Sequence, residues 1–344
     1  MSRLGFQCLP SASSPAPPQR PVLLAVDQEL TEGSCGRVPP VGIDRADPIE
    51  IGKPVSHTRH LARSRVHWYT SRVGDEQIHH TSESALLTAG WREMESSRSD
   101  ALFHDPLAAG LAGERGLRIA KTRPEGAWVV AIRTVLIDGF LHSAISSGID
   151  TVINIGAGLD TRPYRMDLPS SLHWVEVDFP SLIEGKNAQL STEVPACSIE
   201  RVGLDLADRD ARKELLDRIL RTPTRAMVLT EGVLGALSVD EAAGLADDLR
   251  AQTSCESWVI DYFSPRLLAA YQKHQPHPNV PVRFDPPSWE SFFTEHGWRI
   301  GEIRYLGEES ERLHRAVPLS PLDRVMRLFM SRPLRDMGYA ILEH

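Results

Sequence analysis

Two glycines follow a short run of β-forming residues, residues 152–155, in a pattern that suits a ligand site. Gly156 and Gly158 lack a Cβ atom, so the chain can turn sharply there and a ligand can approach the backbone amides. An ordinary tight turn would need the same residues. The next β-forming run, however, ends in Asp178, 20 residues beyond Gly158. A carboxylate at that place can accept hydrogen bonds from both hydroxyls of a ribose. The turn and the acid together predict a ribose-containing ligand.

The residues after the glycines disfavour a dinucleotide. A pyrophosphate-binding turn carries a third glycine before the helix that it opens. Thr161 stands there in this chain, and Arg162 and Pro163 follow it. A proline also removes an amide donor that could face a phosphate. NAD and FAD therefore fit poorly. S-adenosylmethionine, which has a ribose and no phosphate, fits better.

Two more acids follow later β-forming runs. Asp205 precedes Leu206, where a carboxylate can accept from the exocyclic amine of adenine and a neighbouring N–H can reach a ring nitrogen. Asp205 could equally belong to the cap of the helix that begins near Asp208. Glu231 ends a further run before a glycine and can meet a cationic amino group or a sulfonium. Three acids after three consecutive strands suit a cationic nucleoside better than an anionic dinucleotide.

These residues need a scaffold of alternating strands and helices. From residue 150 onward, short apolar runs alternate with amphipathic segments. This pattern predicts an α/β fold: a Rossmann-like, mostly parallel sheet with helices on both faces and ligands at the carboxyl ends of the strands. We expect strands at residues 151–155, 173–178, 199–202, 226–230, 258–263, 298–305 and 338–342. We expect helices at residues 84–96, 127–146, 180–190, 208–220, 238–251 and 288–296, and a short helix through residue 111 that Asp105 caps.

Composition separates the chain into two parts. Residues 1–75 are rich in proline, with nine prolines between residues 10 and 54, and we predict a disordered N-terminal extension there. Residues 76–344 are predicted to form the ligand-binding domain.

Composition also excludes several classes of protein. The net charge of −8 argues against a nucleic-acid partner, and the lack of an apolar run near 20 residues argues against a membrane partner. The four cysteines are widely spaced, which is typical of a reducing compartment and indicates a cytoplasmic protein. We expect no metal site, because the His79-His80 and His274/His277 pairs have no matching carboxylates nearby.

Longer motifs resemble those of one known family. The runs are A-L-F-H-D-P-L-A at residues 101–108, N-I-G-A-G-L-D-T-R-P-Y-R at 154–165, E-V-D-F-P at 176–180 and T-E-G-V-L at 230–234. They resemble the leucine carboxyl methyltransferase family, in its bacterial branch of polyketide carboxyl O-methyltransferases. The resemblance covers roughly residues 82–263. It implies a class I methyltransferase fold with an antiparallel last strand, and S-adenosylmethionine as the methyl donor.

The resemblance also implies roles for particular residues. Gly156 would lie beside the methionine part of the donor, Asp178 at the ribose hydroxyls, and Asp205 with Leu206 at the adenine. Glu231 would lie near the methionine part. An arginine of the helix before the first strand grips the donor carboxylate in this family, and Arg133 is the candidate here.

The acceptor is expected to be a small molecule with a carboxylate or hydroxyl group. A carboxylate is ionised at neutral pH and needs no general base, so we nominate no catalytic residue. Arg162 and Arg165 are weak candidates for holding an anionic acceptor; ion pairs with Asp160 or Asp167 are the alternative.

Two other functions stay open at this point. One is an NAD(P)-dependent oxidoreductase on a Rossmann sheet. The other is a methyltransferase-like protein that binds its ligand without turnover. Gly235-Ala236 permits the second reading, because relatives carry a bulky and an aromatic residue there.

Overall fold

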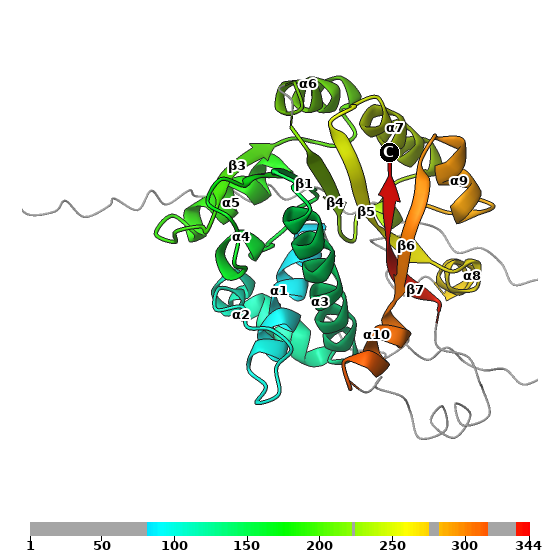
Figure 1. The fold of residues 1–344 in the computed structure, drawn as a ribbon. Helices are drawn as coiled ribbons and strands as arrows, with labels where there is room; N and C mark the ends of the chain where they lie inside the picture. The colour runs from blue at the N-terminus through cyan, green and yellow to red at the C-terminus, as the bar shows by residue number, and fades with distance from the viewer. Residues whose placement is uncertain (1–80, 222–223, 275–281, 316–334) are drawn as a thin grey trace, which may run out of the picture. The chain divides into compact units, whose positions relative to one another are not determined.

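The computed structural model describes residues 81–344, apart from residues 222–223, 275–281 and 316–334. The predicted extension at residues 1–75 lies outside the described residues. A seven-stranded sheet forms the centre of the described part, in the order β3-β2-β1-β4-β5-β7-β6 (Figure 1). Its strands are β1 (Thr151–Ile155), β2 (His173–Asp178), β3 (Ser198–Gly203), β4 (Ala226–Thr230), β5 (Cys255–Phe263), β6 (Arg299–Tyr305) and β7 (Met337–Glu343).

The strand directions confirm the expected class I methyltransferase sheet. Strands β1 to β5 pair in parallel, and β7 inserts antiparallel between β5 and β6. The register brings the carboxyl ends of the central strands level. Ile155 lies opposite Val177 on one side and Thr230 on the other, and Asp178 lies opposite Gly203. The segments that follow these strands therefore meet at one edge of the sheet, which is where a doubly wound sheet binds its ligand.

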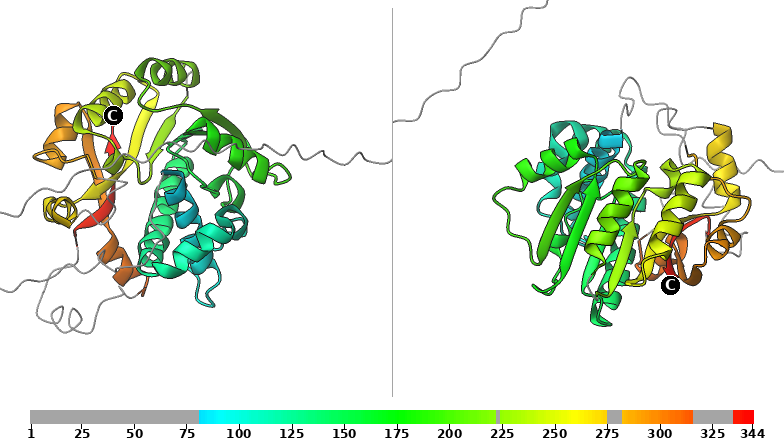
Figure 2. Two further views of the ribbon diagram at one scale, coloured as in Figure 1. Left: turned by 180° about the vertical axis from the view of Figure 1, so that it is seen from behind. Right: turned by 90° about the horizontal axis from the view of Figure 1, so that it is seen from above.

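Helices cover both faces of the sheet (Figure 2). One core cluster joins the sheet to α6, α7 and α9, and another joins the opposite face to α3 and α10. Helices α1 and α2 pack on each other, and α1 also packs on α3. The helices are α1 (Thr81–Ser96), α2 (Ala108–Thr122), α3 (Glu125–Ser146), α4 (Arg162–Arg165), α5 (Pro180–Gln189), α6 (Arg209–Ile219), α7 (Val239–Arg250), α8 (Pro265–His274), α9 (Trp289–Glu295) and α10 (Leu306–Arg312), with a 3-10 turn, η1, at Leu234–Ala236.

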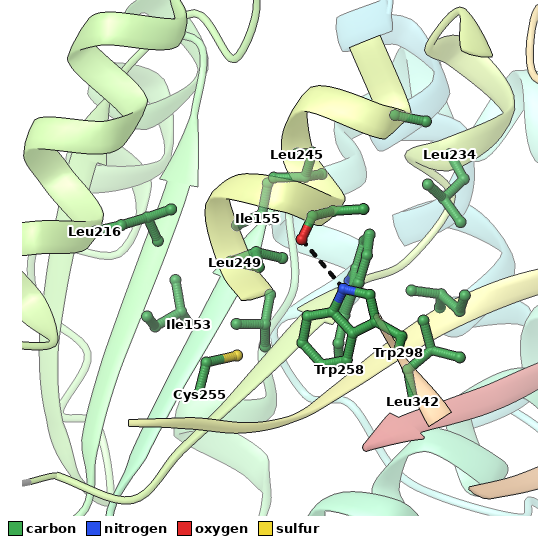
Figure 3. Packing of buried hydrophobic residues seen from close by; sticks show 14 of the residues in the cluster. Ile153, Ile155, Leu216, Leu234, Leu245, Leu249, Cys255, Trp258, Trp298 and Leu342 are labelled. Carbon is green, nitrogen blue, oxygen red and sulfur yellow. Dashed lines mark hydrogen bonds between the residues drawn. The ribbon is translucent and has the colours of Figure 1, made fainter. Parts of the chain in front are cut away.

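Tryptophans fill the core under α7 without leaving their indole N–H groups unpaired. Trp258 and Trp298 are fully buried and pack edge to face, with ring centroids 5.6 Å apart. Trp298 Nε1 donates to the Ala246 carbonyl at 3.1 Å, and Trp258 Nε1 donates to Thr230 Oγ1 at 3.0 Å. Figure 3 shows the first of these bonds among the surrounding Leu, Ile and Cys side chains. The paired indoles anchor α7 to the strands β4 and β5.

Side-chain caps set several helix boundaries. Ser238 and Glu241 form a capping box at the start of α7, and Asp208 accepts from Ala211 N–H at the start of α6. Gly148 ends α3 with φ of +99°, a conformation that glycine adopts at little cost.

The helix after Asp105 was predicted too short. Helix α2 begins at Ala108, after the N-cap Leu107, and continues to Thr122 through a kink at Gly113. Asp105 Oδ1 does accept from Leu107 N–H at 3.2 Å in the turn before this helix. Asp105 also reaches inward. Its Oδ2 accepts from Arg92 Nε at 2.7 Å and from Thr161 Oγ1 at 2.6 Å. These two partners lie on α1 and beyond β1, so no local sequence pattern announces them.

Helix α3 is long and apolar enough to cross a membrane by length and composition alone, with 22 residues and a mean hydropathy of 1.5. Its buried residues, among them Ile132, Leu136, Ile137 and Phe140, belong to the core cluster on one face of the sheet. Core helices of α/β domains pass the same test. We therefore interpret α3 as the helix that packs before β1.

Candidate active site

A cavity of about 1020 Å³ lies at the carboxyl ends of β1, β2, β3 and β4. Segments that are far apart in the sequence form its wall, including part of α1, part of α3, the glycine turn and the loops after β2, β3 and β4. All nine residues that the sequence nominated for ligand binding line this cavity. They are Arg133, Gly156, Gly158, Arg162, Arg165, Asp178, Asp205, Leu206 and Glu231.

The glycine turn requires both of its glycines. Gly156 has φ of +70° and Gly158 has φ of +49°. A Cβ atom on Gly156 would also lie 2.4 Å from Val233 Cγ2, so no larger residue fits there. Gly156 N–H donates to the Val177 carbonyl at 2.8 Å, and this bond fixes the turn against the end of β2. The turn is thereby held open towards the cavity.

Asp178 holds the same turn from the end of β2. Its Oδ2 accepts from Gly158 N–H and its Oδ1 from Phe179 N–H, each at 2.7 Å. Burial raises the pKa of Asp178, and the two backbone N–H bonds oppose that rise. Each carboxylate oxygen has a second lone pair, so both oxygens can still accept a hydroxyl donor.

Asp205 and Leu206 form the cavity wall after β3. Asp205 is exposed, and its Oδ1 accepts from Ala207 N–H at 3.0 Å. The side chain of Leu206 packs against the core cluster that includes α6 and α7. Asp208 caps α6, so the alternative that Asp205 belongs to this cap is not what the structure shows.

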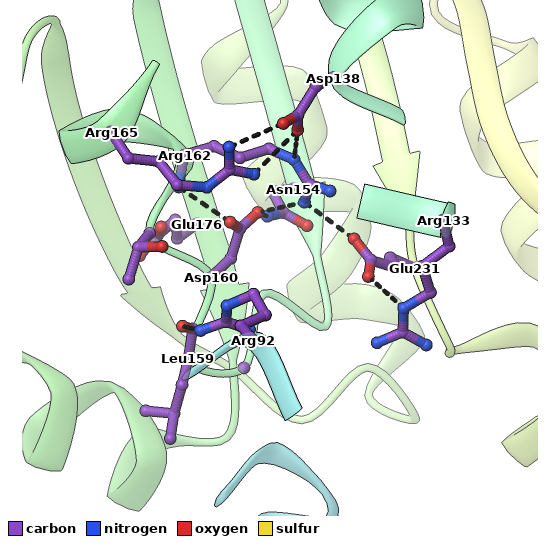
Figure 4. A network of polar contacts seen from close by, with 12 residues as sticks. Arg92, Arg133, Asp138, Asn154, Leu159, Asp160, Arg162, Arg165, Glu176 and Glu231 are labelled. Carbon is purple, nitrogen blue, oxygen red and sulfur yellow. Dashed lines mark hydrogen bonds and ion pairs between the residues drawn. The ribbon is translucent and has the colours of Figure 1, made fainter. Parts of the chain in front are cut away.

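A network of three guanidinium groups and three carboxylates lies beneath the opposite end of the cavity (Figure 4). Arg162 is at its centre, with its side chain only 3% exposed. Its Nη1 reaches Asp160 Oδ2 and Glu231 Oε2, both at 2.8 Å, and its Nε reaches Asp138 Oδ1 at 2.7 Å. These contacts tie α3, the turn after β1 and the turn after β4 together.

Two more arginines complete this network. Arg165 binds both oxygens of Asp138, at 2.7 and 2.9 Å. Arg133 Nε lies 2.8 Å from Glu231 Oε1. Burial lowers the pKa of Arg133, but Glu231 outweighs this effect and raises the pKa above its usual range. Asp160 shows the matching shift for a buried acid. Burial raises its pKa, but the nearby charge of Arg162 outweighs this effect and the pKa falls well below its usual value.

Ion pairs with Asp160 or Asp167 are the alternative role that the sequence leaves for Arg162 and Arg165, and the structure shows one of these two partners. Arg162 does pair with Asp160, whereas Arg165 pairs with Asp138 and not with Asp167. Both guanidinium groups are occupied by carboxylates. That they hold an anionic acceptor stays a prediction.

Sequence reasoning missed three polar residues of this region. Asn154 interrupts the apolar run of β1, and its Nδ2 donates to Asp160 Oδ2 at 2.8 Å. Asp138 on α3 serves both Arg162 and Arg165. Arg92 on α1 lines the cavity, and its Nη2 donates to the Leu159 carbonyl at 2.6 Å. A polar residue inside an otherwise apolar strand was the available signal for Asn154. The roles of Asp138 and Arg92 depend on how α3 and α1 pack, so no local sequence pattern predicts them.

The changed pair Gly235-Ala236 lies in the 3-10 turn after β4. Ala236 lines the cavity, and a Cβ atom on Gly235 would meet no atom of the described residues within 4 Å. The carbonyl of Gly235 accepts from Arg283 N–H at 2.8 Å. The small residues therefore leave space at this wall, and the turn itself stays ordered by a backbone bond.

Asp261 on β5 supports the turn after β4 from below. Both of its oxygens lie within 3.1 Å of Gly232 N, and its side chain hydrogen bonds with that of Tyr339. Burial raises the pKa of Asp261 to about 6, although the Gly232 bond opposes the shift. Between about pH 4 and pH 6, Asp261 therefore holds a proton in the folded protein and has lost it in the unfolded chain.

This shift predicts a pH-dependent stability. A pKa raised in the folded state gives stability that is complete below pH 4 and lost as the pH rises through 6. We expect the unfolding free energy of wild type, minus that of Asp261→Asn, to fall by about 2 kcal/mol between pH 4 and pH 7. Urea unfolding of both proteins at several pH values measures this difference. A difference that rises over the same range would contradict the assignment.

The comparisons with known proteins agree with this geometry. Residues 85–250 match the model of the leucine carboxyl methyltransferase family. A protein of Parafrankia sp. (strain EAN1pec), named as a candidate S-adenosyl-L-methionine-dependent methyltransferase, is 28% identical over 68% of this chain and 82% of its own length. A protein of Frankia alni with the same description is 28% identical over 72% of this chain and 95% of its own length.

Two solved structures match much of this chain at low sequence identity and at TM-scores below 0.5. A DUF574 family protein from Streptomyces avermitilis has a TM-score of 0.45 and 15% identity over 74% of this chain and 96% of its own. A protein from Thermobifida fusca, titled a candidate methyltransferase, has a TM-score of 0.43 and 16% identity over 76% of this chain and 93% of its own. The part of the chain at residues 85–250, which holds the motif runs, therefore belongs to the leucine carboxyl methyltransferase family, and the relatives named above are described as S-adenosyl-L-methionine-dependent methyltransferases.

Proposed function

We propose that this enzyme transfers the methyl group of S-adenosylmethionine to an oxygen of a small molecule, and that this oxygen belongs to a carboxylate. The cavity carries the proposal, because one hollow brings together every group that the donor needs. Asp178, the Asp205–Leu206 loop, Arg133 and Glu231 all line it. In this proposal Asp178 would bind the ribose, the loop would bind the adenine, and Arg133 and Glu231 would bind the amino-acid part.

The residues at the two ends of the cavity fit the two ends of the donor. Arg133 Nε lies 2.8 Å from Glu231 Oε1. No hydrogen bond of its two Nη atoms is found among the described residues, so their fork can bind the donor carboxylate. Glu231 carries a charge opposite to that of the donor's amino group. The acidic groups Asp178 and Asp205 lie at the other end, where hydroxyl and amine donors need acceptors.

The described wall of the cavity favours a carboxylate acceptor over a hydroxyl. Its lining residues in the described ranges include no His, Lys, Cys or Tyr, and the acids Asp160 and Glu231 are held in ion pairs with Arg162. A hydroxyl acceptor needs a general base to take its proton, whereas a carboxylate is already ionised at neutral pH. When bound, the donor supplies a positively charged sulfur as the leaving group. The protein's contribution is then to align donor and acceptor and to exclude water.

The same geometry disfavours a dinucleotide. Helix α4 has only four residues, and Pro163 occupies its first turn. A pyrophosphate would need the free amides of a longer helix start. We further propose that the enzyme acts in the cytoplasm, a placement supported by the free thiols of Cys197 and Cys255.

Paired acceptors test the choice of oxygen. Each pair would contain a carboxylic acid and the alcohol with the same carbon skeleton, incubated with donor labelled in its methyl group. We expect label in the acids only, and mild alkali should release it as methanol because the product is an ester. Alkali-stable label in the alcohols would contradict carboxylate methylation. Donor binding without transfer to any member of a broad panel would favour the non-catalytic reading.

A further inference from the structure

A buried arginine stands behind the loop after β3, away from the donor's own contacts. Arg212 on α6 is 6% exposed and lines the cavity. Its Nη1 donates to the Leu206 carbonyl at 2.5 Å. Its Nε and Nη2 donate to Asp248 Oδ2 on α7, at 3.2 and 2.6 Å. One guanidinium group therefore connects the loop to two helices.

This contact sets the orientation of one peptide unit. The Leu206–Ala207 peptide is planar and trans, so its N–H points opposite to its carbonyl. Arg212 draws the Leu206 carbonyl towards α6 and α7. The N–H of Ala207 then points the other way, and it donates to Asp205 Oδ1 at 3.0 Å. Arg212 therefore influences the orientation of the Asp205 carboxylate through this one peptide unit.

The preceding peptide is fixed as well. The Asp205 carbonyl accepts from Asp208 N–H at 3.0 Å, and Leu204 N–H donates to the Asp178 carbonyl at 2.8 Å. The N–H of Leu206 points away from the Asp205 carbonyl for the same planar reason. The loop thus holds a carboxylate acceptor and a backbone donor side by side, in a pattern that complements the amine and the neighbouring ring nitrogen of adenine.

We propose that Arg212 is a positioning residue for base recognition, which sets the Asp205–Leu206 loop to select a 6-aminopurine over a 6-oxopurine. The inference rests on the proposed function, since it takes the donor's adenine to lie at this loop. A 6-oxopurine puts a carbonyl oxygen against the Asp205 carboxylate and an N–H against the Leu206 N–H, so both contacts become repulsive.

Arg209 supplies a matched control. It lies one turn earlier on α6 and donates to the other oxygen of Asp248, at 3.2 and 2.9 Å. Its side chain is 56% exposed, and no contact between it and Leu206 is found among the described residues. Arg209→Met therefore removes a partner of the same carboxylate and leaves the Leu206 carbonyl in place.

Calorimetry with two ligands tests the proposal. The ligands are S-adenosylhomocysteine and its inosine counterpart, in which oxygen replaces the 6-amino group. For wild type and Arg209→Met we expect the adenine ligand to bind at least about tenfold more tightly. For Arg212→Met the ratio should fall to within about threefold, with most of the loss on the adenine ligand. Arg212→Lys keeps the charge but has no fork to span both partners, so its ratio should lie between the two.

The outcomes separate this inference from the proposed function. Wild type that binds neither ligand would overturn the proposed function, and the inference with it. Wild type that selects adenine, with Arg212→Met weakened equally for both ligands, would assign Arg212 a purely structural role and overturn the inference alone. If Arg212→Met fails to fold, the ratio for Arg212→Lys decides in the same way: an unchanged ratio overturns the inference.

Discussion

Replacing Asp178 with alanine should weaken the binding of S-adenosylhomocysteine by on the order of 100-fold. The change removes the acceptor for two ribose hydroxyls, and hydrogen bonds to a charged group contribute about 1.5–3 kcal/mol each. It also frees Gly158 N–H and Phe179 N–H, which Asp178 holds at 2.7 Å. Titration calorimetry measures the loss. We expect Asp178→Asn to fall between the alanine variant and wild type, because it keeps one acceptor oxygen.

The matched control for this prediction is Asp210→Ala. Asp210 is an exposed acid in the first turn of α6, and it is not among the residues that line the cavity. Its loss should leave the affinity within about twofold of wild type. Equal affinities for Asp178→Ala and wild type would show that the ribose does not lie at the end of β2.

Replacing Arg162 with methionine should lower the unfolding free energy by about 3–5 kcal/mol. Methionine keeps much of the volume but removes the charge that faces Asp138, Asp160 and Glu231. Three carboxylates would then share Arg133 and Arg165. Breaking a buried ion pair from one side costs more than the pair contributes, because the remaining charge stays buried without a partner. Urea unfolding at pH 7 measures the difference.

Arg218→Met is the matched control for stability. Arg218 pairs with Glu200, but the two side chains are 50% and 32% exposed. Water screens such a pair, so its loss should cost no more than about 1 kcal/mol. If Arg162→Met proved as mild as Arg218→Met, the buried network would not be what holds the turns after β1 and β4 together.

Most of the fold could be predicted because its signals are local. Strands β1, β2 and β4 are short and fully or almost fully buried, and the structure places them at the predicted residues. The helix expected at residues 238–251 is found for the same reason, because Ser238 and Glu241 form a local capping box at its start. Helix α10 follows β6 directly, and α4 spans only four residues, so neither shows enough helical period to be recognised.

The residues of the candidate site also differ in whether local sequence signals could predict them. Asp178 ends a strand, and Gly156 and Glu231 each follow one directly. Parallel strands bring their ends together, so a sequence can locate these residues. Arg212 could not be located in this way. It sits in a charged helix, and its role depends on a backbone carbonyl six residues earlier and on an acid of another helix. Only the packing of α6 against α7 brings these groups together.

A crystal structure of the protein with S-adenosylhomocysteine tests the central claim most directly. We predict that the ligand fills the cavity with its ribose hydroxyls on Asp178, its adenine at the Asp205–Leu206 loop and its carboxylate on the Nη atoms of Arg133. A ligand bound elsewhere, bound in the reverse direction, or missing from the cavity at saturating concentration would contradict the claim.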